Sequence, residues 1–368
     1  MKTQITLSTS PSHWLTLSVG MLASIAAVNA QPRFTLQELP IPAGYDWASP
    51  TQINDQGYVV GSSTHAADNN QVATVWKDGT VKVLGKLKDG TYSVATAINS
   101  KGTIVGDGDD GDSRPLGWVT SGSTLVNFFS NNGGNTRPIA INDKGEVGGY
   151  FVKGFSSPWR GAIWTINAKD ARKSTMVTLP VLPSADPVNA NAISFAFNEW
   201  NQAAGWCDSA VGQRAVLWNN DAAHSIVDLG VFGSDWTSVA SGINDLGQVV
   251  GESHPPFGSR PVLWNSDAAH TAIELPLLPG HNYGSASLIN NAGTIVGSSA
   301  YDEPGTWNVS DSHIAIWIGG QVYDLQSIVD QSSGWTVVEI TSINNLGQMA
   351  ASAMRNGAFK AVVLNPVP

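Results

Sequence analysis

The stretch SGINDLGQVVGES, residues 241–253, has near-copies elsewhere in the chain, among them TAINSKGTIVGDG (96–108), IAINDKGEVGGYF (139–151) and SLINNAGTIVGSS (287–299). Their shared core is Ile or Phe, then Asn, two variable residues and usually Gly. Seven such cores begin at Ile53, Ile98, Ile141, Phe197, Ile243, Ile289 and Ile343. The intervals run from 43 residues (98 to 141) to 56 residues (141 to 197), a period typical of propeller blades.

The core itself predicts a tight turn. In the fourth copy, FNEWNQAAGW, Asn201 stands where the other copies have Gly, as at Gly57 and Gly247. After Gly, Asn is the residue that most readily adopts a positive φ. We therefore expect a hairpin between two strands, closed by the side chain of Asp or Asn. A catalytic Asp here is disfavoured, because seven similar copies do not make one active site.

About twenty residues after each Ile-Asn-x-x-Gly segment there is an apolar segment that ends in Trp, which we predict to be a further strand of the unit. It reads VATVW (72–76), RPLGW (114–118), RGAIW (160–164), RAVLW (214–218), RPVLW (260–264), HIAIW (313–317) and, with Leu in the Trp place, KAVVL (360–364). A further short strand comes next in all copies but the last. Each unit thus has four strands, which predicts an all-β protein with the fold of a seven-bladed β-propeller.

The last copy has no fourth strand of its own. The segment FTLQELP (34–40) resembles the fourth strands of other copies, such as TAIELPLLPG. We therefore expect residues 33–39 to complete the blade begun by residues 337–365, in a 3+1 closure that removes open sheet edges. Residues 31–368 then form a single domain, which we expect to be monomeric.

Residues 1–30 read as a signal peptide. Lys2 precedes the apolar run LTLSVGMLASIAAV (15–28), and Val28-Asn29-Ala30 provides a cleavage site with small residues. The run is shorter than the approximately 20 residues of a membrane span, although an uncleaved anchor is the alternative. We expect a secreted or periplasmic protein that starts near Gln31 and has no membrane span after cleavage. Cys207 is the only cysteine, so no internal disulfide is expected.

The net charge of −10 argues against a nucleic-acid partner, which normally requires a basic surface. Beyond this, composition says more about the fold than the function. Gly, Trp and Pro number 38, 14 and 19, and only 13% of residues are charged, a mixture that suits short strands and tight turns.

The combined pattern Ile-Asn-x-x-Gly, Val-Gly and x-Ala-x-x-Trp resembles that of the HAF-repeat family of extracellular repeat proteins, over nearly all of residues 33–365. The family is named for a His-Ala-Phe segment before the Trp, and no copy here has that segment, since Arg mostly replaces the His. The resemblance implies export and a repeat fold. It implies no established reaction.

One position, four residues before each Trp, carries a basic or potentially basic side chain in most copies. It is Val72, Arg114, Arg160, Arg214, Arg260, His313 and Lys360 in chain order. One hypothesis is a cationic ring that binds an anionic saccharide, because the Arg fork pairs well with carboxylate and sulfate. The other, which we favour, is that each residue bridges to a neighbouring blade and fastens the ring.

Aromatic residues gather in the loops expected on one face of the propeller. These loops join second to third strands and one blade to the next, and contain Tyr45, Trp47, Trp159, Trp236, Tyr283, Tyr301, Trp307 and Trp335. Aromatic rings beside Asn, Asp and His suit a carbohydrate, whose CH faces stack on rings while its hydroxyls meet polar groups. The alternative is that several of these rings wedge between blades. Of this set, we select Trp47, Trp236, Tyr283, Tyr301 and Trp307 as ligand-binding candidates, and an extracellular glycan or other surface ligand as the partner.

Catalysis is the second hypothesis. Some seven-bladed propellers are polysaccharide lyases, which need a Tyr or His as base and acid and a cation beside the uronate carboxylate. His254, His281, Tyr283 and Arg260 are the candidates. A third hypothesis is a protein–protein scaffold, since propeller faces readily serve that use.

No cofactor and no metal are expected. The spacings H-x-H and HExxH do not occur. GDGDDGD (106–112) lacks the later Glu of an EF-hand loop, so a solvated acidic loop is expected there and bound calcium is the alternative.

Overall fold

The computed structural model describes residues 31, 33–111, 115–128, 135–154, 157–303 and 309–367. The predicted signal peptide, residues 1–30, lies outside them. Over the described residues the regular structure is all β, apart from the 3-10 turns η2 (Ala171–Lys173), η3 (Leu325–Ile328) and η4 (Gln331–Ser333). None of the helices in this part of the chain is long and apolar enough to cross a membrane. The all-β prediction is confirmed.

Most strands belong to antiparallel sheets of four consecutive strands. The first two sheets are β2 (Trp47–Ile53), β3 (Val59–His65), β4 (Asn70–Lys77) and β5 (Thr80–Gly85), then β6 (Ser93–Ile98), β7 (Ile104–Gly108), β8 (Leu116–Ser121) and β9 (Thr124–Asn127). Two later sheets are β18 (Thr237–Ile243), β19 (Val249–His254), β20 (Arg260–Trp264) and β21 (Ala272–Glu274), then β22 (Tyr283–Ile289), β23 (Ile295–Asp302), β24 (Val309–Ile318) and β25 (Gln321–Asp324).

An eight-stranded sheet lies between these two pairs in sequence, and it has two halves. One half is β10 (Asn135–Ile141), β11 (Glu146–Val152), β12 (Arg160–Thr165) and β13 (Thr175–Thr178); the other is β14 (Ala192–Phe197), β15 (Ala203–Ser209), β16 (Gly212–Trp218) and β17 (Ile226–Gly230). A parallel pairing of Arg160 with Ala192 is the contact between strands β12 and β14 that joins them.

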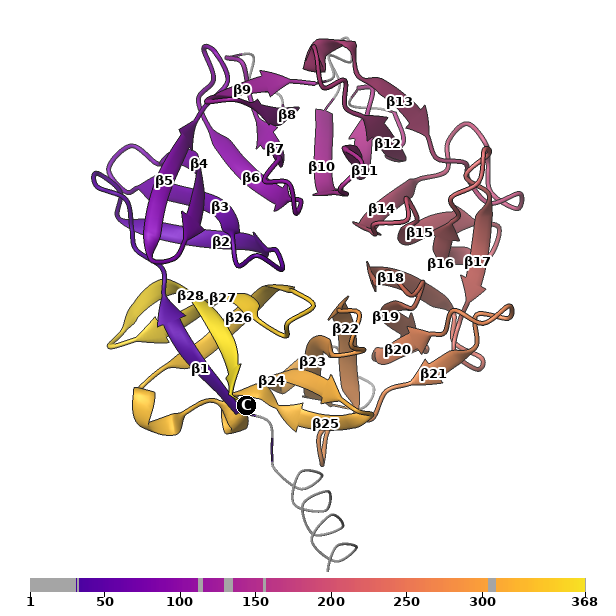
Figure 1. Ribbon diagram of the computed structural model, residues 1–368. Helices are drawn as coiled ribbons and strands as arrows, with labels where there is room; N and C mark the ends of the chain where they lie inside the picture. Colours follow the sequence, from indigo (N-terminus) through magenta and orange to yellow (C-terminus); the bar gives the residue numbers. More distant parts are fainter. Residues whose placement is uncertain are drawn as a thin grey trace, which may run out of the picture.

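The remaining sheet combines the two ends of the chain. Its order is β1 (Arg33–Glu38), β28 (Ala358–Val367), β27 (Met349–Arg355) and β26 (Thr336–Ile343). Strand β1 runs antiparallel to β28, with Phe34 opposite Pro366 and Leu36 opposite Leu364. The segment Arg33–Glu38 thus supplies the fourth strand of this sheet, visible in Figure 1 as the indigo arrow beside the yellow strands.

Figure 1 shows the sheets arranged as a ring. The first strands, such as β2, β10 and β22, face the centre, and the fourth strands, such as β5, β17 and β25, lie outside. The apolar core lies between neighbouring sheets. One cluster, for example, joins Ile53 and Trp76 of the β2–β5 sheet to Ala350 and Val363 of the sheet that contains both chain ends.

The repeated Ile-Asn-x-x-Gly segment forms the hairpin between the first and second strands of its sheet, as predicted. In the first copy, Asn54 Oδ1 accepts hydrogen bonds from the backbone N–H groups of Gln56 and Tyr58, at 3.2 and 2.9 Å. Gly57 has φ +75°, and Asn201, its counterpart in the fourth copy, has φ +62°. The exchange of Gly for Asn is therefore explained by the left-handed backbone that the turn requires.

The same Asn side chains also bind one sheet to the next, which the sequence pattern did not reveal. Six of the seven Nδ2 atoms donate to the backbone carbonyl of the equivalent Asn in the following unit at 3.0–3.1 Å, in the pairs Asn54–Asn99, Asn99–Asn142, Asn198–Asn244, Asn244–Asn290, Asn290–Asn344 and Asn344–Asn54. Asn142 instead donates to Glu146, and the backbone N–H of Asp143 donates to Glu199. This Asn belt follows the ring and joins its last sheet to its first.

The six repeat Trp residues are each at most 1% exposed: Trp76, Trp118, Trp164, Trp218, Trp264 and Trp317. Three of them donate their indole N–H to a proline carbonyl that follows the preceding fourth strand: Trp76 to Pro40, Trp218 to Pro180 and Trp317 to Pro276, at 2.7–2.8 Å. Such a bond satisfies the polar atom of a buried ring. The Trp of the repeat is therefore a core residue, and in these three copies it also holds the connection between sheets.

Candidate functional site

The connections on one side of the ring carry the candidate site. In the first sheet, the backbone N–H of Asp46, just before β2, donates to Thr64 O near the end of β3. The same bond joins Asn282 to Ala300 in the β22–β25 sheet, at 3.1 Å. The sheet-to-sheet connections and the connections between second and third strands therefore lie together, on what we call the loop face.

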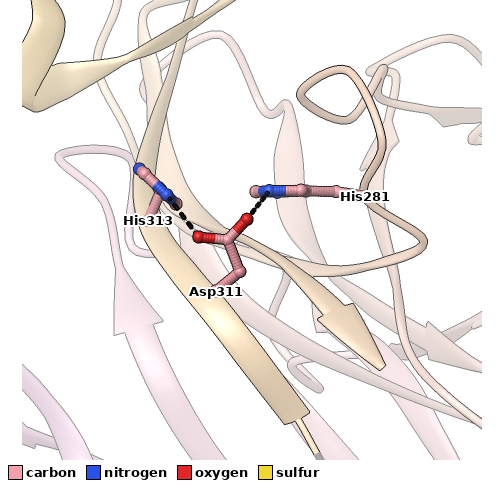
Figure 2. Close-up of side chains that lie close together, drawn as sticks. All are labelled: His281, Asp311 and His313. Carbon is pink, nitrogen blue, oxygen red and sulfur yellow. Dashed lines mark hydrogen bonds and ion pairs between the residues drawn. The ribbon is translucent and has the colours of Figure 1, made fainter. Parts of the chain in front are cut away.

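Two histidines and an aspartate meet on the loop face of the β22–β25 sheet (Figure 2). His281 comes from the connection before β22, whereas Asp311 and His313 lie in β24. His281 Nε2 is 3.4 Å from Asp311 Oδ2, and His313 Nε2 is 3.1 Å from Asp311 Oδ1. The two imidazole centroids are 5.5 Å apart. We call these three residues the His–Asp–His cluster.

The other nitrogen of each ring is held by a separate partner. His281 Nδ1 lies 2.8 Å from the hydroxyl of Ser299, a fully buried residue of β23. His313 Nδ1 lies 3.2 Å from Asp324 Oδ2, at the end of β25. Because one nitrogen of each ring is fixed, both Nε2 atoms point toward Asp311.

A β-bulge sets the position of Asp311. Pairing between β23 and β24 shifts register after Ser299–His313 and resumes at Tyr301–Ser310, so that two residues of β24 face one residue of β23. Asp311 has φ +49°, which such a bulge accommodates. The insertion that lengthens this copy of the repeat therefore turns Asp311 toward the histidines.

The charges of the cluster support one another. The hydrogen bond from His313, and after it that from His281, lowers the pKa of Asp311. The hydrogen bond to Asp311 and the nearby Asp324 raise the pKa of His313. Asp311 is two-thirds exposed while the His281 side chain is buried, so the cluster reaches solvent through its carboxylate.

A cavity of about 580 Å³, with a mixed polar and apolar lining, adjoins the cluster. It lies between the β22–β25 sheet and β26, and its lining includes Ser298, Ser312, His313, Asp324 and Glu339. Tyr301, which is 39% exposed, pairs with Ser310 two residues before Ser312. Hydroxyls and carboxylates are thus available around one recess, and the exposed ring of Tyr301 belongs to β23, the strand that contributes Ser298 to the lining.

The predicted row of basic residues is engaged in contacts within the protein. In three sheets, the basic side chain at the start of the third strand pairs with an acid of the fourth strand: Arg260 with Glu274 at 3.1 Å, His313 with Asp324 at 3.2 Å, and Lys360 with Glu38 at 2.9 Å. Arg160 donates to the carbonyls of Pro187 and Val188, and Arg214 to that of Trp236. The three acid pairs lie within one sheet each, so they do not fasten one blade to the next. Only Arg160 and Arg214 reach connections that lead to the next first strand. The fastening role and the anion-binding ring both stay predictions. Arg114 lies outside the described residues.

The remaining catalytic candidates lie around Glu252 on the loop face, His254 and Arg260 in the β18–β21 sheet and Tyr283 at the start of β22. His254 Nε2 is 3.6 Å from Glu252 Oε1, whose other oxygen accepts from Ser259 at 2.8 Å. Tyr283 is half-buried, and burial followed by the charge of Glu252 raises its pKa. A phenol of this kind keeps its proton, so it suits the role of an acid better than that of a base.

The two corners are built on equivalent positions. Arg260 pairs with Ser253 in β19, as His313 pairs with Ser299 in β23. Arg260 lies between Glu274 and Asp235, with its Nε 3.5 Å from Asp235 Oδ2. An Arg–carboxylate group in one sheet is therefore replaced by two imidazoles and a carboxylate in the next.

The loop-face aromatics divide into exposed and buried rings. Trp47 and Trp236 are 43% and 63% exposed, as expected for rings open to a ligand. The expectation that Trp335 is exposed is wrong: it is 6% exposed, packs in the core of the sheet that contains both chain ends, and has Arg355 over its ring at 5.1 Å. The predicted Trp307 lies outside the described residues.

The acidic stretch 106–112 is partly engaged in side-chain bonds. Asp107 pairs with Arg137 at 2.7 Å and accepts from Tyr92 at 3.1 Å. Asp109 accepts from the backbone and hydroxyl of Thr91. These two carboxylates are therefore engaged in contacts within the protein, Asp107 linking β7 to β10 through Arg137. Residue 112 lies outside the described residues.

Sequence reasoning named His281 and His313 separately and did not join them. Asp311, Ser299 and Asp324 were missed. The available signals were the Asp-x-His spacing at 311–313 and an acid before Leu in several fourth strands, seen at Glu38, Asp228, Glu274 and Asp324.

No family model matches the chain, and no curated protein matches it. Among solved structures, it is similar to the β-propeller domain of the Trilobed protease from Pyrococcus furiosus, with TM-score 0.52, 11% identity, and coverage of 87% of this chain and 94% of that one. It is also similar to virginiamycin B lyase from Staphylococcus aureus, with TM-score 0.50, 12% identity, and coverage of 90% and 99%.

A third similar structure is puromycin hydrolase, with TM-score 0.54 and 12% identity. The match covers 89% of this chain and 54% of the hydrolase, so the chain spans about half of that enzyme. At such identities the likeness concerns the fold alone. The chain has a β-propeller-like fold, a scaffold on which many unrelated functions occur.

Proposed function

We propose that the protein is a seven-bladed β-propeller with a 3+1 closure that binds a carbohydrate on its loop face. If the two halves of the eight-stranded sheet are separate blades, the count is seven. The pairing of β1 with β28 and the Asn344–Asn54 hydrogen bond support closure, because both join segments from opposite ends of the chain.

The cavity beside the His–Asp–His cluster carries the binding proposal. Carbohydrate sites combine hydrogen-bonding groups, which meet the hydroxyls, with an aromatic ring that stacks on the sugar face. Ser298, Ser312 and Glu339 supply the first kind of group, and Tyr301 is the nearby exposed ring. Trp47 and Trp236 extend the aromatic surface of the same face.

A glycan array that includes neutral and acidic polysaccharides tests this proposal. We expect binding by the wild type, and a loss of about tenfold or more with Tyr301→Ala, equivalent to about 1.4 kcal/mol. Trp200 provides a matched control, because it is exposed but lies in the Asn198–Asn201 hairpin at the opposite end of the strands. Trp200→Ala should bind like the wild type.

The pattern of loss among the variants shows which part of the loop face binds the sugar. Loss only with Trp236→Ala would move the sugar to the β18–β21 corner. No glycan binding by the folded wild type would overturn the proposal and favour a protein–protein scaffold.

A polysaccharide lyase is the second candidate, supported by the proximity of His254 and Tyr283 to Glu252. A lyase creates an unsaturated product that absorbs ultraviolet light. Incubation with a panel of polyuronates should therefore produce absorbance if the protein is such an enzyme, and the signal should disappear with Tyr283→Phe. A flat trace with all substrates would exclude turnover of the panel and retain the binding function.

We also propose export and kinship with the HAF-repeat family. The leader of residues 1–30 supports export. Intact-mass measurement of the protein recovered from the medium or periplasm should give a chain that starts near Gln31, whereas a full-length mass would contradict cleavage.

A further inference from the structure

We propose that His281, Asp311 and His313 form a binding site for a divalent transition-metal ion, and that Zn²⁺ is the ion that this donor set favours. The inference goes beyond carbohydrate binding and does not rest on it. Imidazole nitrogen and carboxylate oxygen are standard ligands of Zn²⁺.

The donor spacing fits one ion. Zn–N bonds of 2.0–2.1 Å in a tetrahedral site place neighbouring donors about 3.3 Å apart. Asp311 is 3.4 Å from His281 Nε2 and 3.1 Å from His313 Nε2, and one ligand atom from each of the three residues lies within 4.8 Å of the others. Small side-chain rotations then suffice to surround an ion.

The partners of the other ring nitrogens are those of a metal site. A metal-binding histidine commonly donates its second N–H to a carboxylate, hydroxyl or carbonyl, which fixes its tautomer and leaves the first nitrogen as ligand. Asp324 holds His313 in this way, and buried Ser299 holds His281. Both Nε2 atoms are left to face the shared carboxylate, as Figure 2 shows.

The equivalent position in the β18–β21 sheet shows how the His–Asp–His cluster differs from an ordinary ion pair. There, the guanidinium of Arg260 supplies the positive charge between Asp235, 3.5 Å away, and Glu274, 3.1 Å away. In the β22–β25 sheet the Arg is replaced by His313, and His281 enters from the connection. Two imidazoles around one carboxylate repel each other when both are charged, whereas a dication is bound by both when they are neutral.

Three protein ligands leave one position of a tetrahedral ion open, the arrangement of zinc sites that bind an exchangeable ligand. Asp311 is exposed, and His313 also lines the neighbouring cavity. The fourth ligand is therefore water or an oxygen of a bound molecule.

The experiment is a Zn²⁺ titration of chelator-treated protein, followed by calorimetry. We expect one equivalent per chain, and a loss of affinity of at least about 100-fold in His281→Ala and in His313→Ala. Asp324→Asn, which alters a positioning residue, should weaken binding about 10- to 100-fold while one equivalent is retained. His65→Ala is the control: His65 also pairs with an aspartate on the loop face, at 2.8 Å from Asp68, but has no second imidazole among the described residues. It should bind like the wild type.

Co²⁺ absorption of the wild type provides a second readout that needs no variant. Intense visible bands at one equivalent indicate four-coordinate nitrogen and oxygen ligation and support the site. Wild-type Zn²⁺ binding that is absent, or equal to that of folded His281→Ala/His313→Ala, would overturn it. If that double variant does not fold, weak six-coordinate Co²⁺ bands in the wild type overturn it instead. Failure of glycan binding has no bearing on these readouts.

Discussion

At the scale of single residues, the repeat is explained by backbone geometry and by hydrogen bonds. Asn54 closes its own hairpin through Oδ1 and reaches the next sheet through Nδ2. The Gly of the Val-Gly pair has a different role. In Gly251, a Cβ would lie 2.0 Å from Val239 O, where β18 bulges between Ala240 and Gly242. Glycine is required at this place by the close approach of two strands.

Gly251→Ala should therefore destabilise the protein by about 3 kcal/mol, because the added methyl meets backbone that cannot move aside easily. Urea unfolding measures this change. Gly154→Ala is the control, since a Cβ there would have its nearest neighbour at 4.0 Å. Equal midpoints for the two variants would contradict the proposed clash.

The pair of His254 and Glu252 predicts a dependence of stability on pH. The hydrogen bond to Glu252 raises the pKa of His254 above 6.5. Burial opposes the charge of Glu252, but the bonds from His254 and Ser259 outweigh it and lower that pKa below 4.5. The His254 contribution is full below pH 6.5 and is lost as pH rises through its folded pKa; the Glu252 contribution is full above pH 4.5 and is lost as pH falls through its folded pKa.

His254→Gln should therefore cost about 1 kcal/mol at a pH between these values and less at alkaline pH. Urea unfolding of wild type and variant at both pH values measures the difference. A cost that does not change with pH would show that the ion pair makes no net contribution.

At the scale of elements, strand β1 is the one whose docking most affects the stability of the sheet that contains both chain ends. Phe34 is 4% exposed and packs in the same cluster as Trp335, Val337 and Leu364, far away in sequence. A strand whose side chains are buried in this way contributes apolar burial as well as ladder hydrogen bonds. The N-terminal strand is thus part of the core of the sheet that contains both chain ends.

Phe34→Ala should destabilise the protein by about 3–5 kcal/mol, the usual cost of removing a buried aromatic ring. The neighbouring Arg33 is exposed, so Arg33→Ala should change the free energy of unfolding by less than about 0.5 kcal/mol. Thermal and urea unfolding measure both variants. A Phe34→Ala protein as stable as wild type would mean that β1 is not docked on β28 in solution.

At the scale of the whole molecule, the Asn belt is a feature that no single repeat contains. Each bond crosses from one sheet to the next, and the Asn344–Asn54 bond spans 290 residues of sequence. Such bonds are buried or partly buried, where an amide without a partner is costly. The repeat is therefore kept similar because every copy must match its neighbour.

Asn344→Asp tests this effect. The carboxylate still accepts from the N–H groups of Leu346 and Gln348, but it no longer donates to Asn54 O or to Gln348 Oε1. We expect a loss of about 1–3 kcal/mol in urea unfolding. Asn365→Asp is the control, because Asn365 accepts from Gln348 within the same sheet. Equal stability of the two variants would contradict a role for the belt.

The sequence by itself determined the repeat unit, its hairpin turns and its buried Trp, because these depend on local backbone geometry and on alternating burial within a few residues. It also identified His281 and His313 as polar residues of interest. Only the tertiary structure decided that they face each other across Asp311, since their approach depends on the packing of a connection against β24 and on a bulge in that strand. The pairing of the basic residues with fourth-strand acids was likewise decided by strand register. Contacts between segments so far apart in the chain leave no periodic signal, because they result from how whole sheets pack.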